Sequence, residues 1–329
     1  MAFALLIFFG LNQVGLLNRG DVTLSTTRIV GQDPVSASAS LARESHGGGA
    51  ETVIIAGTSA LADGVVATGL AGAMDAPILL NDVDQLSPQI LDVLRELDTE
   101  RVILIGGTSA LNEIVAATLQ NDLRIEVTRV AGASRFDTAA QVADLFAEEA
   151  DPAMIDGRRS ALVVPAENVP LGLEAGSLAA SRDGPMPVLI SQSGRLPSPI
   201  LDLIDRMAIE QLFVVAGGPE DGGSVSDDFN GPVRVIQGAA GAANMTLNAR
   251  AFRPPRVVMV PGGDQARTLI AGPLAAREAG VILTAQEALP WLQENCGTID
   301  ELFVIGEPDV IPDQQIATAE QAATNCPEE

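Results

Sequence analysis

The chain has 329 residues, of which 47% are hydrophobic and only 3% are aromatic. This is enough material for two or three domains whose cores are packed by small aliphatic side chains. Its 43 acidic residues outnumber the 19 basic ones and give a net charge of -24, which excludes a general nucleic-acid or anionic-membrane binder, because both need a positive surface.

The first residues form an apolar run, "MAFALLIFFGL" at 1–11, that is too short to span a bilayer. The run resembles the apolar region of an export signal, although no basic residue precedes it and no clear cleavage site follows it. We expect residues 1–26 to be a leader or the remnant of an export signal, and the protein to be secreted. The alternative is an ordinary buried terminal segment. We expect no transmembrane span elsewhere.

Short apolar runs alternate with helical patterns from residue 52 onward. A β-branched run that ends at glycine predicts a buried strand, and Ser87 followed by Pro88 predicts a helix start. The first elements predicted in this way are a strand at 52–57, a helix at 61–74, a strand at 77–81, a helix at 87–97, a strand at 102–106 and a helix at 112–119.

The same rhythm returns twice. The second series has strands at 161–165, 187–191 and 212–218 and helices at 171–180 and 198–207. The third has strands at 257–261, 281–284 and 302–306 and helices at 268–279 and 288–296. Alternation of short buried strands with helices implies parallel sheets covered on both faces, with right-handed crossovers.

Three sequence features recur in the same order and mark internal repeats. They are a basic residue three positions before glycine ("RIVG" at 28–31, "RVAG" at 129–132 and, weakly, "VIQG" at 235–238), an apolar triplet after a small residue or proline (76–81, 186–191 and 279–284), and a strand ending at glycine (102–107, 212–218 and 302–307). They divide the chain into three units at 27–127, 128–235 and 236–329.

The stretch "RVAGASRFDTAAQVADLF" at 129–146 resembles the opening signature of the cell wall binding repeat 2 family. The first unit adds the family's later motifs, an Asp turn at Asp63, a Pro-Ile-Leu-Leu strand, a Ser-Pro helix start and a Gly-Gly strand end. The residues that fit the opening signature are Arg129, Gly132, Ser134, Arg135, Phe136, Asp137, Thr138 and Ala139.

The resemblance implies an α/β fold of three Rossmann-like or toprim-like parallel-sheet units packed in a pseudo-threefold array, a pseudo-trimer within one monomeric chain. It also implies a non-catalytic protein that lies at the cell wall or cell surface of a Gram-positive bacterium and anchors non-covalently to an anionic secondary polymer of the wall. One alternative is a structural or interaction module that kept the fold and lost polymer binding. A second is a small-molecule-binding or enzymatic α/β protein.

The polar motifs are less complete than the fold motifs. The Arg-aromatic-acidic-Thr positions read Pro34, Val35, Ser36 and Ala37 in the first unit and Gly241, Ala242, Ala243 and Asn244 in the third. The Asp turn becomes Leu171-Gly172-Leu173 and Arg267-Thr268-Leu269 in the later units. The second unit therefore keeps the charged signature, and the first keeps the turn aspartate.

The candidate ligand-binding residues are Arg129, Arg135, Phe136, Asp137 and Asp63. Arginine suits planar oxygen anions, because its guanidinium can donate two parallel hydrogen bonds. The competing interpretation is that Arg129 and Arg135 make salt bridges between packed repeats.

Other chemistry has little support in the sequence. The Gly106-Gly107 turn is interpreted as a tight strand-to-helix turn, because the chain has no P-loop motif and no lysine to reach a phosphate. The single histidine, His46, lies in a predicted loop without a catalytic motif, and no metal-ligand spacing is present. We expect no resident cofactor or metal, although divalent cations could bridge this acidic chain to an anionic polymer.

The two cysteines, Cys296 and Cys326, lie near the end of the sequence. Their spacing fits neither a zinc site nor a redox pair. A disulfide bond that holds the C-terminal segment is the expectation for an exported protein. The alternative is two unrelated buried thiols.

Overall fold

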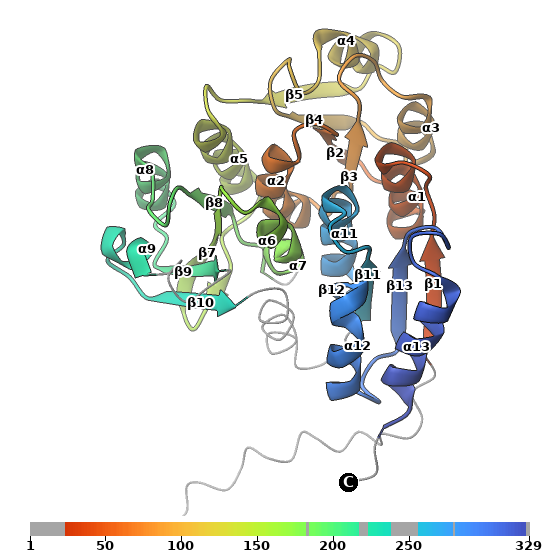
Figure 1. Cartoon of the computed structure of the whole chain (residues 1–329). Coiled ribbons are helices and arrows are strands. Elements are labelled where there is room, and N and C mark those ends of the chain that lie inside the picture. Colours follow the sequence, from red (N-terminus) through yellow and green to blue (C-terminus); the bar gives the residue numbers. More distant parts are fainter. Residues whose placement is uncertain (1–23, 182–183, 217–222, 238–255, 279, 327–329) are drawn as a thin grey trace, which may run out of the picture.

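The computed structural model describes residues 24–181, 184–216, 223–237, 256–278 and 280–326. Within them the chain forms three mainly parallel sheets, one for each predicted unit (Figure 1). The predicted fold class, several parallel-sheet α/β units, is confirmed. The apolar run at 1–11 and the third copy of the signature at 241–244 lie outside the described residues.

The first sheet has the strand order β3-β2-β4-β5, and all of its neighbouring strands are parallel. Its strands are β2 (Thr52–Gly57), β3 (Ile78–Asn81), β4 (Arg101–Ile105) and β5 (Glu126–Val130). The helices of this part of the chain are α1 (Pro34–His46), α2 (Leu61–Ala73), α3 (Pro88–Glu96) and α4 (Glu113–Asn121).

The two faces of this sheet belong to different cores, as the alternation of side chains along a strand requires. In β2, Val53 and Ile55 pack in an outer core with residues of α1, α3 and α4. Ile54 and Ala56 point the other way, into a central core shared with the second and third units. Continuous apolar strands are therefore needed, because both faces are buried.

The second sheet repeats this order as β10-β9-β7, with β8 on the far side of β7 and a short antiparallel strand, β6, beside its start. Its strands are β6 (Met154–Ile155), β7 (Arg158–Pro165), β8 (Val188–Ser191), β9 (Gln211–Ala216) and β10 (Val233–Gln237). Its helices are α5 (Arg135–Glu149), α6 (Val169–Glu174), α7 (Gly176–Ala179), α8 (Ser198–Arg206) and α9 (Gly223–Asp228).

The helix predicted at 171–180 is in fact two short helices, α6 and α7, which meet at Ala175. Glycines at 172 and 176 weaken a continuous helix here. They also allow close packing, because a Cβ added to Gly176 would lie 3.3 Å from the side chain of Thr68 in the first unit.

The third sheet has the order β12-β11-β13-β1 and is closed by a strand from the start of the described chain. Its strands are β1 (Ser25–Ile29), β11 (Arg256–Val260), β12 (Gly280–Thr284) and β13 (Glu301–Ile305), and its helices are α11 (Gln265–Arg277), α12 (Ala285–Glu294) and α13 (Asp313–Thr324). Arg28 of β1 lies opposite Val304 of β13. Strands β1 and β13 lie side by side in Figure 1.

Strand pairing is therefore offset from the unit boundaries predicted from the sequence. Strand β5 contains the boundary between residues 127 and 128, yet all five of its residues pair with β4 of the first unit. The motif that opens a unit in the sequence thus ends the sheet of the preceding unit. Because β1 belongs to the third sheet, the three units form a closed ring.

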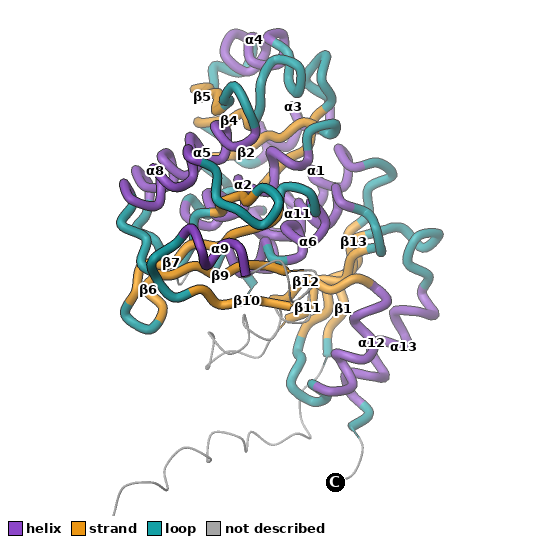
Figure 2. Tube along the Cα trace, turned by 60° about the vertical axis from the view of Figure 1, so that its left-hand side comes forward, coloured by secondary structure: helices purple, strands orange, loops and turns teal. Residues whose placement is uncertain are grey.

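Helices α2, α7 and α11, one from each unit, contact one another at the centre of the molecule. In Figure 2 the strands of the three sheets surround this centre, whereas α4, α8 and α13 lie at the periphery. Gly72 of α2 is needed for the contact, because a Cβ there would lie 2.2 Å from the carbonyl oxygen of Ala180. The central packing explains the abundance of small residues in these helices.

Candidate functional site

The strand order of each sheet brings its first and third strands in chain order side by side. The carboxyl ends of these two strands form a crevice, which is the usual ligand position in open α/β sheets. We call this crevice the switch point. In the first unit it lies between β2 and β4, and Asp63 in the first turn of α2 reaches it. A Cβ added to Gly106, directly after β4, would lie 3.1 Å from Oδ2 of Asp63.

Asp63 lies within electrostatic reach of Arg135 at this point, although 72 positions separate them in the sequence, from 63 to 135. Burial raises the pKa of the Asp63 carboxyl group, and the positive charge of Arg135 partly opposes that rise. Arg135 is the first residue of α5, is exposed, and donates from Nη1 to the carbonyl oxygen of Ala166 at 3.1 Å. Arg135 thus connects the first switch point to the end of β7 in the second unit.

A hollow lies beside Arg135 at the border of the first and second units. Apolar and small residues supply most of its walls, with one arginine and one asparagine among them. The residues that line it are Ala62, Val65, Arg135, Val164, Pro165, Ala166, Asn168, Val169, Gly172 and Ile190. A cation beside an apolar wall suits an anionic ligand with an apolar face.

Arg129 has a different role from Arg135. It lies on β5 and donates from Nη1 to the carbonyl oxygen of Gly106 at 3.0 Å and from Nη2 to that of Asn112 at 3.5 Å. Gly106 has a φ of +102°, so the turn after β4 requires glycine. Arg129 therefore holds this tight turn within the first sheet, to which β5 belongs, although the sequence assigned Arg129 to the second unit.

Asp137 is engaged at the N-terminus of α5. Its carboxylate accepts from the backbone N–H of Ser134 at 3.0 Å, and the Ser134 hydroxyl accepts from the N–H of Asp137 at 3.3 Å. Helix α1 has the same capping box with the residue types exchanged: Asp33 is the N-cap residue and Ser36 is the third residue of the helix. The Ser-x-x-Asp spacing could have revealed this structural role in the sequence.

Phe136 follows Arg135 and is half-buried against the central core. Of the five candidate residues, the structure thus brings Asp63 and Arg135 together at one switch point and places Arg129 on the turn beside it. Phe136 packs against the central core, and Asp137 caps the helix that carries Arg135.

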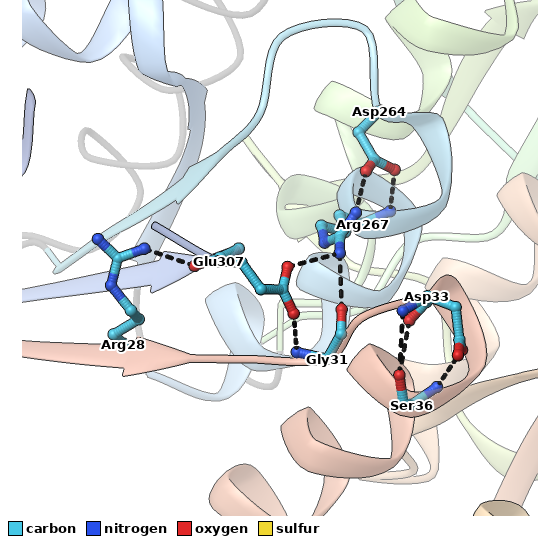
Figure 3. Close-up of polar contacts among 8 residues, drawn as sticks. Arg28, Gly31, Asp33, Ser36, Asp264, Arg267 and Glu307 are labelled. Carbon is cyan, nitrogen blue, oxygen red and sulfur yellow. Dashed lines mark hydrogen bonds and ion pairs between the residues drawn. The ribbon is translucent and has the colours of Figure 1, made fainter. Parts of the chain in front are cut away.

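The switch points of the other two units differ in charge. In the second unit Leu171 takes the place of Asp63 and is buried. In the third unit that place is taken by Arg267, which is only 7% exposed. Its Nη2 atom donates to the carbonyl oxygen of Gly31 at 2.7 Å and to Oε2 of Glu307 at 3.0 Å (Figure 3).

His46 is not in a loop, as the sequence analysis expected, but is the last residue of α1 and is buried. Its Nε2 atom lies 3.1 Å from the carbonyl oxygen of Asp75. A basic residue is favoured in the last turn of a helix, where carbonyl groups are exposed, and packing against the first turn after α2 buries this one.

No group of three or more His, Cys, Asp or Glu residues that could hold a metal occurs among the described residues. Across the same part of the chain, every helix is too short or too polar to cross a membrane. Cys296 and Cys326 form a disulfide bond, with their Cα atoms 5.4 Å apart. The bond connects the segment after α12 to the segment after α13.

Residues 28–116 match the family model of Cell wall binding domain 2, abbreviated CWB2. Over this segment the chain resembles the CWB2 family. The resemblance inferred from the sequence is thereby confirmed, and the matched residues include Asp63 and the turn at Gly106. Arg129 and Arg135 lie beyond the matched segment, in the structure that completes the first sheet and begins the second unit.

Curated relatives match the chain over part of their length. The chain is 29% identical over 189 residues to N-acetylmuramoyl-L-alanine amidase LytC of Bacillus subtilis (strain 168), which covers 56% of this chain and 35% of the relative. It is 22% identical over 282 residues to the Amidase enhancer of the same organism, covering 82% of this chain and 36% of the relative. The chain thus spans about a third of the length of these relatives.

Solved structures share the fold of this chain. Cwp6 from Clostridium difficile has a TM-score of 0.79 at 19% identity and covers 93% of this chain and 49% of its own. Cwp8 from the same organism has a TM-score of 0.74 at 22% identity and covers 91% of this chain and 52% of its own. Both likenesses extend over all three units, well beyond the segment that matches the family model.

Proposed function

We propose that the protein binds the bacterial cell wall non-covalently, as a non-catalytic anchoring module that is secreted to the cell surface. The observation that carries this proposal is the CWB2 match over residues 28–116. The name of one relative, an amidase, describes a protein of which this chain matches 35%. The shared part is the wall-binding part in this proposal, and the hydrolytic activity belongs to the rest of that relative.

The polymer contact is best placed at the hollow between the first and second units. Arg135 offers an exposed guanidinium there, and the walls beside it are apolar. A phosphate or carboxylate of a secondary wall polymer would pair with Arg135, while the sugar faces pack on the apolar wall. Asp63 restrains Arg135 electrostatically and would disfavour a ligand that brings too many negative charges.

The contacts of Arg129 and Asp137 favour binding over catalysis. Arg129 is held on backbone carbonyls, and Asp137 is held in a helix cap. These contacts fix the shape of the surface that carries Arg135. They leave the guanidinium of Arg135, which has one short contact to Ala166, as the group best placed to meet a ligand.

A wall pull-down tests the proposal. Purified protein is mixed with isolated walls, with and without their secondary polymer, and the bound fraction is measured. We expect binding to need the polymer and to fall at least tenfold in Arg135→Ala, a loss of about 1.4 kcal/mol. Arg43→Ala is the matched control, because it removes the same charge from an exposed surface pair with Glu96. Equal recovery from both wall preparations would refute anchoring.

Divalent cations enter the proposal through the charge of -24. An acidic protein and an anionic polymer repel one another unless arginines or cations intervene. We expect EDTA to lower wall binding and added Ca²⁺ to restore it. Binding that EDTA leaves unchanged would remove the cation bridge and leave Arg135 as the proposed contact.

A further inference from the structure

We propose that Arg267 and the backbone N–H of Gly31 form a carboxylate-binding site, and that Glu307 of the same chain fills it. Each oxygen of the Glu307 carboxylate has its own donor in this site. Oε1 accepts from the N–H of Gly31 at 2.6 Å, and Oε2 accepts from Nη2 of Arg267 at 3.0 Å (Figure 3). The donors come from two elements, the loop before α1 and the first turn of α11.

The start of the second unit shows what Glu307 replaces. Gly132, the counterpart of Gly31, donates its N–H to the hydroxyl of Thr138 at 3.0 Å. Helix α1 has Ala37 in the place of Thr138 and therefore lacks that acceptor. Glu307 occupies the sequence position at which the first unit has Gly107. Together, the two differences replace a threonine hydroxyl with the Glu307 carboxylate as the acceptor of this N–H.

The site is rigid and deeply placed. Arg267 is 7% exposed, and its backbone N–H donates to Oδ1 of Asp264 at 2.9 Å in a helix cap. Its Nη1 atom pairs with the other oxygen of Asp264, which keeps half of the guanidinium occupied. A buried guanidinium that keeps unpaired donors is unfavourable, so the remaining donors favour a carboxylate at the position of Glu307.

Removal of the Glu307 side chain would leave preformed donors with no acceptor. These are the Gly31 N–H and one hydrogen on Nη2 of Arg267, which would join the Nε atom of Arg267, buried and unpartnered already. Donors held in place by the backbone bind a ligand at a lower entropic cost than flexible ones. A small carboxylate such as formate or acetate has the geometry to replace the lost group.

This inference bears on the proposed function, on which its biological meaning rests. A carboxylate from the chain itself closes the third switch point, and the second has Leu171 in place of a charge. The first switch point has Gly107 where the third has Glu307, and a Cβ at Gly107 would meet nothing within 4 Å. Among the described residues, the first switch point thus lacks the carboxylate that occupies the third.

Chemical rescue tests the site without any wall material. Thermal unfolding of the whole chain and of Glu307→Ala is measured in sodium formate and in sodium chloride at equal ionic strength. We expect the variant to unfold at a lower temperature in chloride and to regain about 2 °C or more in formate, with saturation. The unaltered protein should unfold at the same temperature in both salts, because Glu307 already fills the site.

Two further variants make the result specific. Arg267→Met combined with Glu307→Ala should lose the response to formate, and Glu96→Ala, which frees the exposed Arg43, should not gain one. A response that persists in the double variant, or equal responses in the unaltered protein and Glu307→Ala, would overturn the proposal. Should Glu307→Ala fail to fold in chloride, Glu307→Ser, whose hydroxyl is too short to reach Arg267, undergoes the same comparison and decides the outcome. A failure of wall anchoring would leave all of these results unchanged.

Discussion

The guanidinium of Arg28 donates a hydrogen bond to the carbonyl oxygen of Gly306 at 2.6 Å, across 278 positions of the sequence. Arg129 does the same to Gly106 in the first sheet. Strand β1 therefore serves the third sheet as β5 serves the first. The arginine of the repeat motif in β1 thus contacts the turn after β13 and joins the two ends of the described chain.

The Arg28 contact should contribute measurably to stability. Arg28→Met removes the partners of the Gly306 and Ile311 carbonyl oxygens at the turn after β13. We expect the free energy of unfolding to fall by about 1–3 kcal/mol, because hydrogen bonds to a charged group are lost at a partly buried site. Urea unfolding measures the change.

Arg206→Met is the control for this prediction. Arg206 makes an exposed ion pair with Asp144 at 2.9 Å, and such pairs contribute about 0–1 kcal/mol. Equal losses in both variants would show that Arg28 acts as an ordinary surface charge.

The Cys296–Cys326 disulfide should stabilise the C-terminal unit. The bond spans 30 positions, and in the chain-entropy model a loop of this size contributes roughly 3–4 kcal/mol. Replacing both cysteines with serine should lower the free energy of unfolding by that amount. Reductant should lower the stability of the unaltered protein and have no effect on the double variant. Equal sensitivity of both to reductant would contradict the prediction.

Stability should depend on pH through Glu174, which lies on α6 of the second unit. Burial, and then repulsion from Glu287 on α12 of the third unit, raise the pKa of Glu174 to about 7. An acid whose pKa is higher in the folded state binds more protons there, so stability falls as the pH rises from 4.5 to about 7 and then levels off. Acidification toward the pKa of this carboxyl group in the unfolded chain restores the lost stability.

Glu174→Gln tests this dependence. We expect the variant to be more stable than the unaltered protein at pH 8, by on the order of 1 kcal/mol after allowance for solvent screening, and no more stable at pH 5. Urea unfolding at both pH values measures the difference. Asp202→Asn on the exposed side of α8 is the matched control, and its stability relative to the unaltered protein should be the same at both pH values. A Glu174→Gln effect that does not change with pH would contradict the prediction.

The electrostatic influence of Arg135 on Asp63 predicts how the pKa of Asp63 responds to a substitution. Arg135→Gln removes the positive charge that opposes the burial effect, so the pKa of Asp63 should rise further. Carboxyl NMR signals followed against pH measure the shift. Arg43→Gln, which acts on Glu96, should leave Asp63 unchanged. If Arg135→Gln does not move the Asp63 titration, the two side chains are not neighbours in solution.

Much of the architecture is visible in the sequence because both faces of each parallel sheet are buried. Such strands read as short apolar runs that end at glycine, and the runs predicted at 52–57 and 102–106 coincide closely with β2 and β4. The prediction of one continuous helix at 171–180 was wrong, because glycines that allow the close central packing also interrupt the helix. Local patterns carry no information about such contacts.

The sequence by itself determined the repeated α/β units, the resemblance to a wall-binding family, and Asp63 and Arg135 as candidate residues. Tertiary structure alone decided that β1 belongs to the third sheet and that Asp63 lies within electrostatic reach of Arg135. It also decided that the Glu307 carboxylate occupies the switch point of the third unit, where it accepts from Arg267. The physical reason is that periodicity and turn chemistry are local, whereas charge pairing and sheet closure depend on which distant segments the core brings together.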